Sequence, residues 1–225
     1  MRAVCLQHVP FEGPGAFAGL LEKRGYQIDQ RLVPEVGLPD DPGDVLLVMG
    51  GPMSVNDPIS WIQNELGFIR DFVESGMPFV GICLGGELLA KAFGAQVAPS
   101  PRPEIGITPI WLTPEGKWHP VFREVPDPWE VFEWHGDMFD LPDGAVPLAK
   151  SDVCVQAFEF GPKAYGLLFH PEIDQAGIEA LCRECPQDLA LSGKDPTALL
   201  AEATPHLPQL HGWLARLVDH LLAAE

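Results

Sequence analysis

The stretch from Pro78 to Phe93 most constrains how the chain can fold, because it places a cysteine between a strand and a helix. Residues 79–82 form a short apolar run that predicts a buried strand. The stretch ends in apolar residues at helical spacing. Gly81 and Gly85 flank Cys83, which relieves the crowding where a strand turns directly into a helix. The pattern therefore predicts that Cys83 stands at the apex of this turn, above the sheet.

Cys83 is consequently a candidate nucleophile. A thiol at the start of a helix faces the first backbone N–H groups, whose partial positive charge favours the thiolate. The alternative is a buried structural cysteine, which a single cysteine more often is. The flanking glycines favour the nucleophile, so another part of the chain must supply a base.

Composition limits the classes of function that fit such a site. The chain carries 32 acidic and 14 basic residues, a net charge of −18, so we expect no nucleic-acid partner. No apolar run approaches the ~20 residues that cross a membrane, and no membrane partner is expected. The N-terminus leads into a strand pattern without signal-peptide features, so the expected location is cytoplasmic.

The cysteines and histidines predict neither a metal site nor a cofactor. Five cysteines without a secretion signal do not indicate a disulfide framework. Cys182 and Cys185 have the C-x-x-C spacing, but no second pair or nearby histidine cluster completes a zinc site.

Strand and helix patterns alternate through the first hundred residues, which predicts an α/β fold with a doubly wound, mostly parallel sheet and flanking helices. We expect a loop over residues 34–43, helices over 16–25 and 61–75, and strands over 3–9, 26–33, 44–49 and 79–82. Reactive loops of such sheets gather beyond the carboxyl ends of the strands. This brings together the loops at 8–15 and 50–57 and the Cys83 turn.

The second half of the chain predicts a small antiparallel extension, because strand patterns follow one another with few helices between them. These strands are expected over residues 105–112, 129–134, 146–150, 155–160 and 164–169. From Asp174 onward the pattern is helical, and the last helix carries an apolar stripe that is typical of a core face. No linker divides the chain, so residues 1–225 are expected to form a single domain.

The string His170-Pro171-Glu172 supplies the candidate base. Proline restricts the residue before it to extended conformations, so His170 should lie at a strand end. Residues two apart in an extended segment point the same way. Glu172 can then orient the imidazole of His170 through one ring nitrogen, while the other ring nitrogen faces Cys83. The alternative is a surface histidine beside a solvated glutamate.

Four motifs follow one another along the chain: Met49-Gly50-Gly51-Pro52, Gly81-Ile82-Cys83-Leu84-Gly85, Glu133-Trp134-His135-Gly136-Asp137 and Gly166-Leu167-Leu168-Phe169-His170-Pro171-Glu172. In this order and spacing they resemble the motifs of the class I (triad) glutamine amidotransferases. The chain looks like a stand-alone domain similar to the glutaminase domain of GMP synthetase, and the resemblance covers essentially its whole length. It implies a flavodoxin-like arrangement of the predicted sheet.

The resemblance implies a role for each matching residue. Cys83 would attack the γ-carbonyl of a glutamine-like substrate and form a γ-glutamyl thioester. His170 would protonate the leaving ammonia or amine and then activate water, while Glu172 orients His170. The oxyanion would be stabilised by the amides of Gly51 and Leu84, and such donors are typically worth about 3–4 kcal/mol each.

Three positions bear on the substrate. Glu87 stands where the family usually carries a substrate-contacting glutamine, as in the related γ-glutamyl hydrolases, and could pair with the α-ammonium of a γ-glutamyl group. Alternatively, it is an acid favoured by the first turn of a helix. In either case it opposes ionisation of Cys83. His135 is a candidate substrate-binding residue or a structural histidine, and His8 faces the same cleft or lies exposed in a loop.

Two classes of function remain open. The first is an amidotransferase that releases ammonia from glutamine, with a separate synthetase subunit as partner. The second is a partner-free γ-glutamyl hydrolase or peptidase. A degenerate family member that only binds its ligand is disfavoured, because Cys83, His170 and Glu172 are all present. In both enzymatic classes the substrate is a small molecule.

Overall fold

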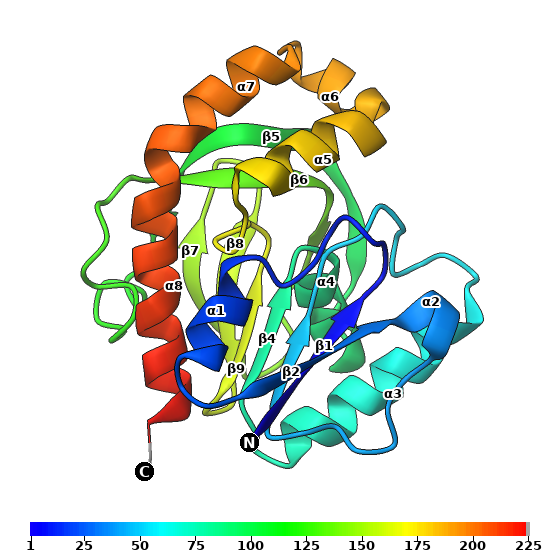
Figure 1. The fold of residues 1–225 in the computed structure, drawn as a ribbon. Coiled ribbons are helices and arrows are strands. Elements are labelled where there is room, and N and C mark those ends of the chain that lie inside the picture. Colours follow the sequence, from blue (N-terminus) through cyan, green and yellow to red (C-terminus); the bar gives the residue numbers. More distant parts are fainter. Residues whose placement is uncertain (224–225) are drawn as a thin grey trace.

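A computed structural model describes residues 1–223, and in this part of the chain nine strands form one mixed sheet (Figure 1). The strand order is β2-β1-β3-β4-β9-β8-β7-β5-β6. The pairs from β2 to β9 are parallel, and the pairs from β9 to β6 are antiparallel. This confirms the predicted α/β fold with a mostly parallel sheet and an antiparallel extension in the second half.

The elements follow one another as the sequence patterns suggest. The strands are β1 (Arg2–Gln7), β2 (Gln27–Leu32), β3 (Val45–Val48), β4 (Phe79–Ile82), β5 (Val97–Leu112), β6 (Trp129–Phe139), β7 (Val146–Lys150), β8 (Val155–Phe160) and β9 (Ala164–Leu167). The helices are α1 (Ala16–Glu22), α2 (Val33–Val36), α3 (Ser60–Glu74), α4 (Leu84–Ala92), α5 (Gln175–Glu184), α6 (Pro186–Ser192), α7 (Pro196–Ala203), the short 3₁₀ turn η1 (Thr204–His206) and α8 (Leu207–Leu222).

Several predicted segments differ from the structure at their ends, and two of these differences have a clear physical reason. The expected loop over 34–43 begins inside the short helix α2, because Pro34 lies in its first turn, where the fixed φ of proline suits a helix. Strand β5 begins at Val97, eight residues before the expected start at Ile105. Its prolines are tolerated because β5 pairs with β7 only through its last two residues, which leaves one edge of the remaining strand free.

Helices cover both faces of the parallel part of the sheet, because successive side chains of a buried strand point to opposite sides. On β1, Cys5 packs in the core that includes α1 and α8, and Leu6 packs in the core that includes α3 and α4. Figure 1 shows α5, α6 and α7 crossing above the carboxyl ends of the strands. Within residues 1–223, none of the helices has the length and apolar character that crossing a membrane requires.

The predicted turn at Cys83 is present and tightly packed. Cys83 has φ 51° and is the single non-glycine residue with positive φ in the described chain. Its N–H donates to the Leu167 carbonyl on the neighbouring strand β9 (2.7 Å). A Cβ added to Gly81 would overlap the Gly85 carbonyl, and one added to Gly85 would overlap the Val48 carbonyl. The glycines therefore let α4 start directly against the sheet.

We predict that Gly85→Ala destabilises the protein, because the clashing atom is a backbone carbonyl that cannot rotate away. Overpacking of this kind costs about 1–3 kcal/mol, and urea unfolding measures the loss. The control is Gly67→Ala within α3, where an added Cβ has open space, and where the change should stabilise by about 0.5–1 kcal/mol. Equal stability of Gly85→Ala and the wild-type protein would contradict this account of the turn.

Candidate active site

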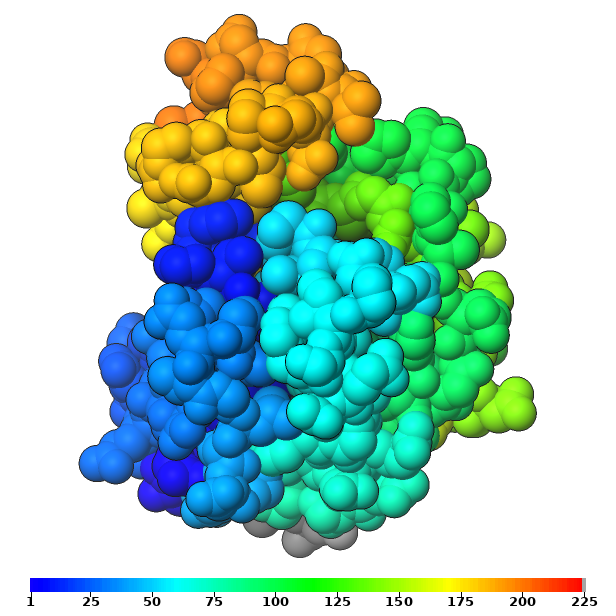
Figure 2. Space-filling view, turned by 90° about the vertical axis from the view of Figure 1, so that its right-hand side faces the viewer, coloured from blue at the N-terminus to red at the C-terminus, as the bar shows by residue number. Residues whose placement is uncertain are grey.

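Cys83 opens into a pocket at the carboxyl edge of the parallel strands. Figure 2 shows this side of the molecule hollowed where the yellow and orange helices overhang the cyan segment. The pocket is lined by the loop after β3, the start of α4, the middle of β6 and the α5–α6 junction. Among residues 1–223, no lysine or arginine lines it. Its ionisable and hydroxyl side chains, apart from the imidazole of His135, belong to Glu12, Ser54, Cys83, Glu87, Asp137, Cys185 and Asp188.

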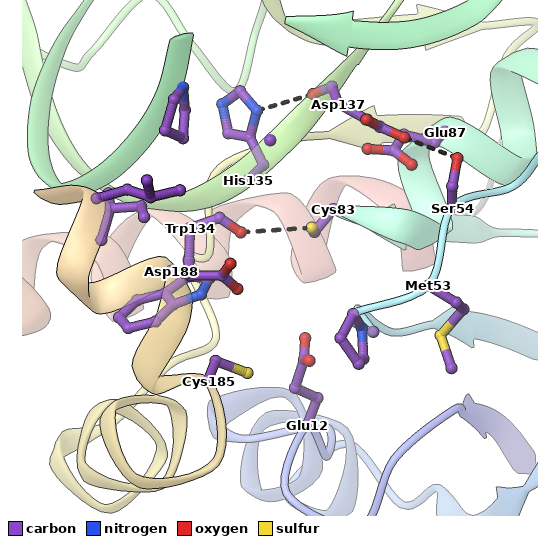
Figure 3. A pocket seen from close by; sticks show the side chains of 16 residues that line it. Glu12, Met53, Ser54, Cys83, Glu87, Trp134, His135, Asp137, Cys185 and Asp188 are labelled. Carbon is purple, nitrogen blue, oxygen red and sulfur yellow. Dashed lines mark hydrogen bonds between the residues drawn. The ribbon is translucent and has the colours of Figure 1, made fainter.

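The Cys83 thiol is buried and protonated in this state of the protein. It donates to the Trp134 carbonyl, with 3.6 Å between sulfur and oxygen (Figure 3). Burial raises the pKa of Cys83 well above its ordinary value, and Glu87 and Glu12 add to the increase. The Leu84 amide acts in the opposite direction but is outweighed. The helix start therefore favours the thiolate, as expected, but burial and the neighbouring carboxyl groups outweigh it.

His170 and Glu172 form the pair that the sequence predicts. His170 follows β9, and its backbone N–H donates to the Phe132 carbonyl (2.8 Å), which holds the residue in place. Its Nδ1 lies 2.9 Å from a Glu172 carboxylate oxygen, so the imidazole donates there from Nδ1. Burial lowers the pKa of His170, but the Glu172 carboxylate more than offsets this, and the net shift is upward.

The thiol and the imidazole approach the same carbonyl without bonding to each other. His170 Nε2 is buried and has no hydrogen-bond partner in the described chain. The Trp134 carbonyl that accepts from Cys83 also contributes to the raised pKa of His170. In this state, therefore, the thiol is directed to the Trp134 carbonyl and makes no hydrogen bond to His170 Nε2.

The two residues that carry the predicted oxyanion donors, Gly51 and Leu84, pack closely against each other. A Cβ added to Gly51 would lie 3.1 Å from the Leu84 side chain and 3.1 Å from His8, so the loop after β3 is wedged against the start of α4. Gly51 lines the pocket, and its N–H donates to no group in the part of the chain that the structure describes. A free backbone amide beside a nucleophile is suited to stabilising negative charge that develops during a reaction.

Glu87 lies on α4 one turn after Cys83 and faces the pocket. Its side chain is 3 % exposed and has no hydrogen bond within residues 1–223. Burial, together with the nearby Asp137, raises the pKa of Glu87 to about 8. Asp137 itself accepts from the Ser54 hydroxyl (2.8 Å; Figure 3). This side of the pocket therefore offers carboxylates that lack a cationic partner.

Three further pocket residues were not predicted from the sequence. Glu12 comes from the loop after β1, whereas Cys185 and Asp188 come from the α5–α6 junction (Figure 3). Burial raises the pKa of Glu12 to about 7, despite the attraction of His170. Glu12 also lines the adjoining hollow that contains His170 and Glu172. No local motif marks these residues, although the expected gathering of strand-end loops pointed to the loop that carries Glu12.

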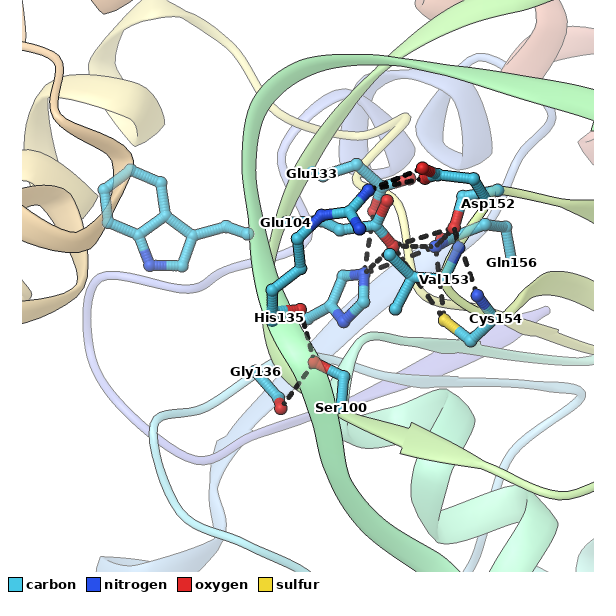
Figure 4. Close-up of polar contacts among 12 residues, drawn as sticks. Ser100, Glu104, Glu133, His135, Gly136, Asp152, Val153, Cys154 and Gln156 are labelled. Carbon is cyan, nitrogen blue, oxygen red and sulfur yellow. Dashed lines mark hydrogen bonds and ion pairs between the residues drawn. The ribbon is translucent and has the colours of Figure 1, made fainter.

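His135 lines the pocket, but its ring nitrogens are engaged elsewhere (Figure 4). Nδ1 donates to the Asp137 carbonyl (2.9 Å), and Nε2 lies 3.4 Å from carboxylate oxygens of both Glu104 and Glu133. Glu104 also accepts from Gln156 (2.8 Å). This buried network supports the structural alternative for His135.

Two groups in the described residues bring three possible metal ligands within 4.8 Å of one another: Glu104, His135 and Cys154, and His119, Glu159 and His220. Neither group includes Cys83 or His170. Glu104 already accepts from Ser151 and Gln156, and Glu159 accepts from Tyr165. These hydrogen bonds account for the carboxylates without a metal ion.

Comparison with known proteins links the site to one family. Residues 22–178 match the family described as glutamine amidotransferase class-I. The chain is 35% identical to YfeJ, a glutamine amidotransferase-like protein of Salmonella typhimurium, over 100% of this chain and 98% of YfeJ. It is 29% identical to the γ-glutamyl-L-1-hydroxyisopropylamide hydrolase of a Pseudomonas species, over 80% and 66% of the two chains.

Longer relatives and solved structures indicate the same family. A GMP synthase of Thermomicrobium roseum is 36% identical over 57% of this chain but only 23% of its own length. The chain therefore spans about a quarter of that enzyme. A crystal structure of a glutamine amidotransferase from Thermotoga maritima superposes with a TM-score of 0.89 at 29% identity, over 100% of this chain and 99% of that one. The fold, the pocket and these likenesses together assign the chain to the class I glutamine amidotransferase family.

Proposed function

We propose that the protein cleaves the γ-amide bond of glutamine or of a γ-glutamyl compound through a thioester on Cys83. The observation that carries this proposal is the arrangement of residues where the Cys83 pocket adjoins the hollow that contains His170 and Glu172. A buried thiol and an imidazole held by Glu172 approach the same carbonyl, and a free Gly51 amide lies beside them. Family membership supports hydrolysis of a glutamine-type amide.

In the first half-reaction, Cys83 Sγ attacks the γ-carbonyl carbon as its proton passes to His170 Nε2. The carbonyl oxygen becomes an oxyanion, which the amides of Gly51 and Leu84 stabilise. The C–N bond then breaks as the leaving nitrogen takes the proton from His170. Ammonia or an amine departs, and the γ-glutamyl group remains on sulfur as a thioester.

In the second half-reaction, water attacks the thioester and gives its proton to His170 Nε2. The C–S bond breaks, glutamate leaves, and the proton returns to the Cys83 sulfur. Glu172 keeps the accepting nitrogen of His170 in place and stabilises the imidazolium in both steps. The raised pKa values of both groups support a resting thiol and a basic imidazole rather than a preformed thiolate, so the thiol must turn from the Trp134 carbonyl toward His170 Nε2.

Glutamine and γ-glutamyl amides are the two candidate substrates. The GMP synthase relative suggests ammonia delivery to a separate synthetase, whereas the Pseudomonas hydrolase suggests a partner-free reaction on a γ-glutamyl amide. The unpartnered Glu87 fits the α-ammonium of a γ-glutamyl group in either case. Because the pocket lining is acidic and lacks lysine and arginine, a substrate panel should include γ-glutamyl amides of cationic amines.

A diazoketone analogue of glutamine should label Cys83 in preference to the other four cysteines. Attack by the Cys83 sulfur requires both the pocket and His170, whereas Cys185 lines the same pocket with a pKa of about 11 and no such base. Peptide mass spectrometry locates the label. Cys83→Ser should abolish labelling and Cys185→Ser should leave it in place. Preferential labelling of Cys5, Cys154, Cys182 or Cys185 would contradict the assignment of the nucleophile.

Glu87→Gln should lower kcat/KM by about 10- to 100-fold for glutamine and for a γ-glutamyl dipeptide, since both carry an α-ammonium. A charge-assisted hydrogen bond of about 1.5–3 kcal/mol is then lost, mainly through KM. Steady-state kinetics on both substrates measures the effect, and Glu74→Gln on the exposed side of α3 is the control. The substrate that the wild-type enzyme prefers separates the two candidate functions. Unchanged kinetics of Glu87→Gln would remove Glu87 from substrate binding.

A further inference from the structure

A buried ion pair lies directly behind the Gly50-Gly51 loop. His8 follows β1, and Glu65 projects from α3, and both side chains are fully buried. His8 Nε2 lies 3.1 and 3.2 Å from the two Glu65 carboxylate oxygens, and its Nδ1 lies 3.0 Å from the Gly50 carbonyl. The Trp61 ring stacks on the imidazole at 5.3 Å between centroids. The expectation that His8 faces the cleft, or lies exposed in a loop, is wrong.

The partners of His8 fix its protonation. A carbonyl oxygen only accepts, so Nδ1 must carry a proton, and an ionised carboxylate likewise requires a proton on Nε2. His8 is then an imidazolium between two acceptors. Burial lowers the pKa of His8, but Glu65 more than offsets this, and the Gly50 carbonyl raises it further. The charged pair of His8 and Glu65 therefore links α3 to the loop after β3 through hydrogen bonds on both ring nitrogens of His8.

The hydrogen bond from His8 to the Gly50 carbonyl determines the direction of the Gly51 backbone amide. The Gly50 carbonyl and the Gly51 N–H belong to one planar trans peptide unit, in which the two groups point in opposite directions. Holding the Gly50 oxygen toward His8 therefore turns the Gly51 N–H away from His8, on the side where Gly51 lines the pocket with Cys83. No other group in the described chain donates to the Gly50 oxygen. With no Cβ on either residue, this peptide would otherwise rotate easily.

We propose that His8 and Glu65 are positioning residues that hold the Gly50-Gly51 peptide in the orientation that directs the Gly51 amide at the reaction oxyanion. The inference rests on the proposed function, because it supposes that an oxyanion forms beside Cys83. It gives a buried charge pair that does not itself line the pocket a role in the rate of the chemical step.

Two substitutions separate the two contacts of His8. In His8→Gln, the side-chain amide can take the place of Nε2 and still donate to Glu65, but nothing takes the place of Nδ1. In His8→Asn, the amide nitrogen takes the place of Nδ1 and donates to the Gly50 carbonyl, but it does not reach Glu65. His8→Asn is therefore combined with Glu65→Gln, which removes the carboxylate charge that would otherwise be buried alone.

We expect His8→Gln to lower kcat on γ-glutamyl-p-nitroanilide by about 10- to 100-fold, with KM changed less than about threefold, because a misdirected oxyanion donor affects the transition state. Inhibition by the γ-aldehyde of glutamate, which forms an oxyanion-like adduct with a thiol, should weaken by a similar factor. Alkylation of Cys83 by iodoacetamide, which forms no oxyanion, should be unchanged. The double variant His8→Asn/Glu65→Gln should recover most of kcat.

A separate variant controls for the effect of lost stability on kcat. Val218→Ala on α8 creates a small cavity remote from the pocket and should lower Tm without lowering kcat. The positioning role is overturned if His8→Gln keeps wild-type kcat. It is also overturned if both His8 variants lose kcat and iodoacetamide reactivity together in proportion to their loss of Tm, which is the result expected of a purely structural pair.

A spectroscopic measurement on the wild-type protein needs no substrate. Nitrogen-15 NMR at neutral pH should show protons on both ring nitrogens of His8, assigned by their absence in His8→Asn/Glu65→Gln. A neutral His8 with an unprotonated Nδ1 would contradict the positioning role of His8, whatever the kinetics of the variants show. Failure of the wild-type protein to hydrolyse any γ-glutamyl compound, with His8 doubly protonated, would instead count against the proposed function.

Discussion

The left-handed backbone at Cys83 is the constraint on which the rest of the site depends. A non-glycine residue in this region typically costs about 1–3 kcal/mol, so surrounding contacts must hold it. Here the Cys83 N–H donates to the Leu167 carbonyl of β9, and the glycines on either side let the start of α4 pack against Gly81 of β4 and the Val48 carbonyl of β3. The same packing that forces the turn therefore places the Cys83 thiol in the lining of the pocket. It also places the first backbone amides of α4 next to the thiol.

The electrostatics of the pocket follow from this burial. Carboxylates from four separate segments surround a thiol that receives no cationic side chain, so the pKa of Cys83 lies above its ordinary value. The basic groups near the reaction path are histidines that are each held by a glutamate, His170 by Glu172 and His8 by Glu65. In this account, the enzyme keeps its thiol neutral until a substrate brings a carbonyl within reach, and it then relies on a proton acceptor and oriented amides.

The sequence predicted what local chemistry determines. The glycine spacing indicated the turn at Cys83, and the proline after His170 indicated a strand end, because both effects act within a few residues. The pairing of Glu65 with His8 could not be predicted, since it depends on how α3 packs across the sheet. Glu12 and Asp188 meet only because α6 folds back over the loop after β1.

The central claim is that turnover passes through a γ-glutamyl thioester on Cys83. Rapid acid quenching of the wild-type enzyme during turnover of γ-glutamyl-p-nitroanilide, followed by peptide mass spectrometry, tests it directly. The leaving group departs readily, so acylation should outpace hydrolysis. The account predicts one γ-glutamyl group on the peptide that contains Cys83, removable by hydroxylamine. Full turnover with no adduct on that peptide, together with wild-type activity in Cys83→Ala, would contradict it.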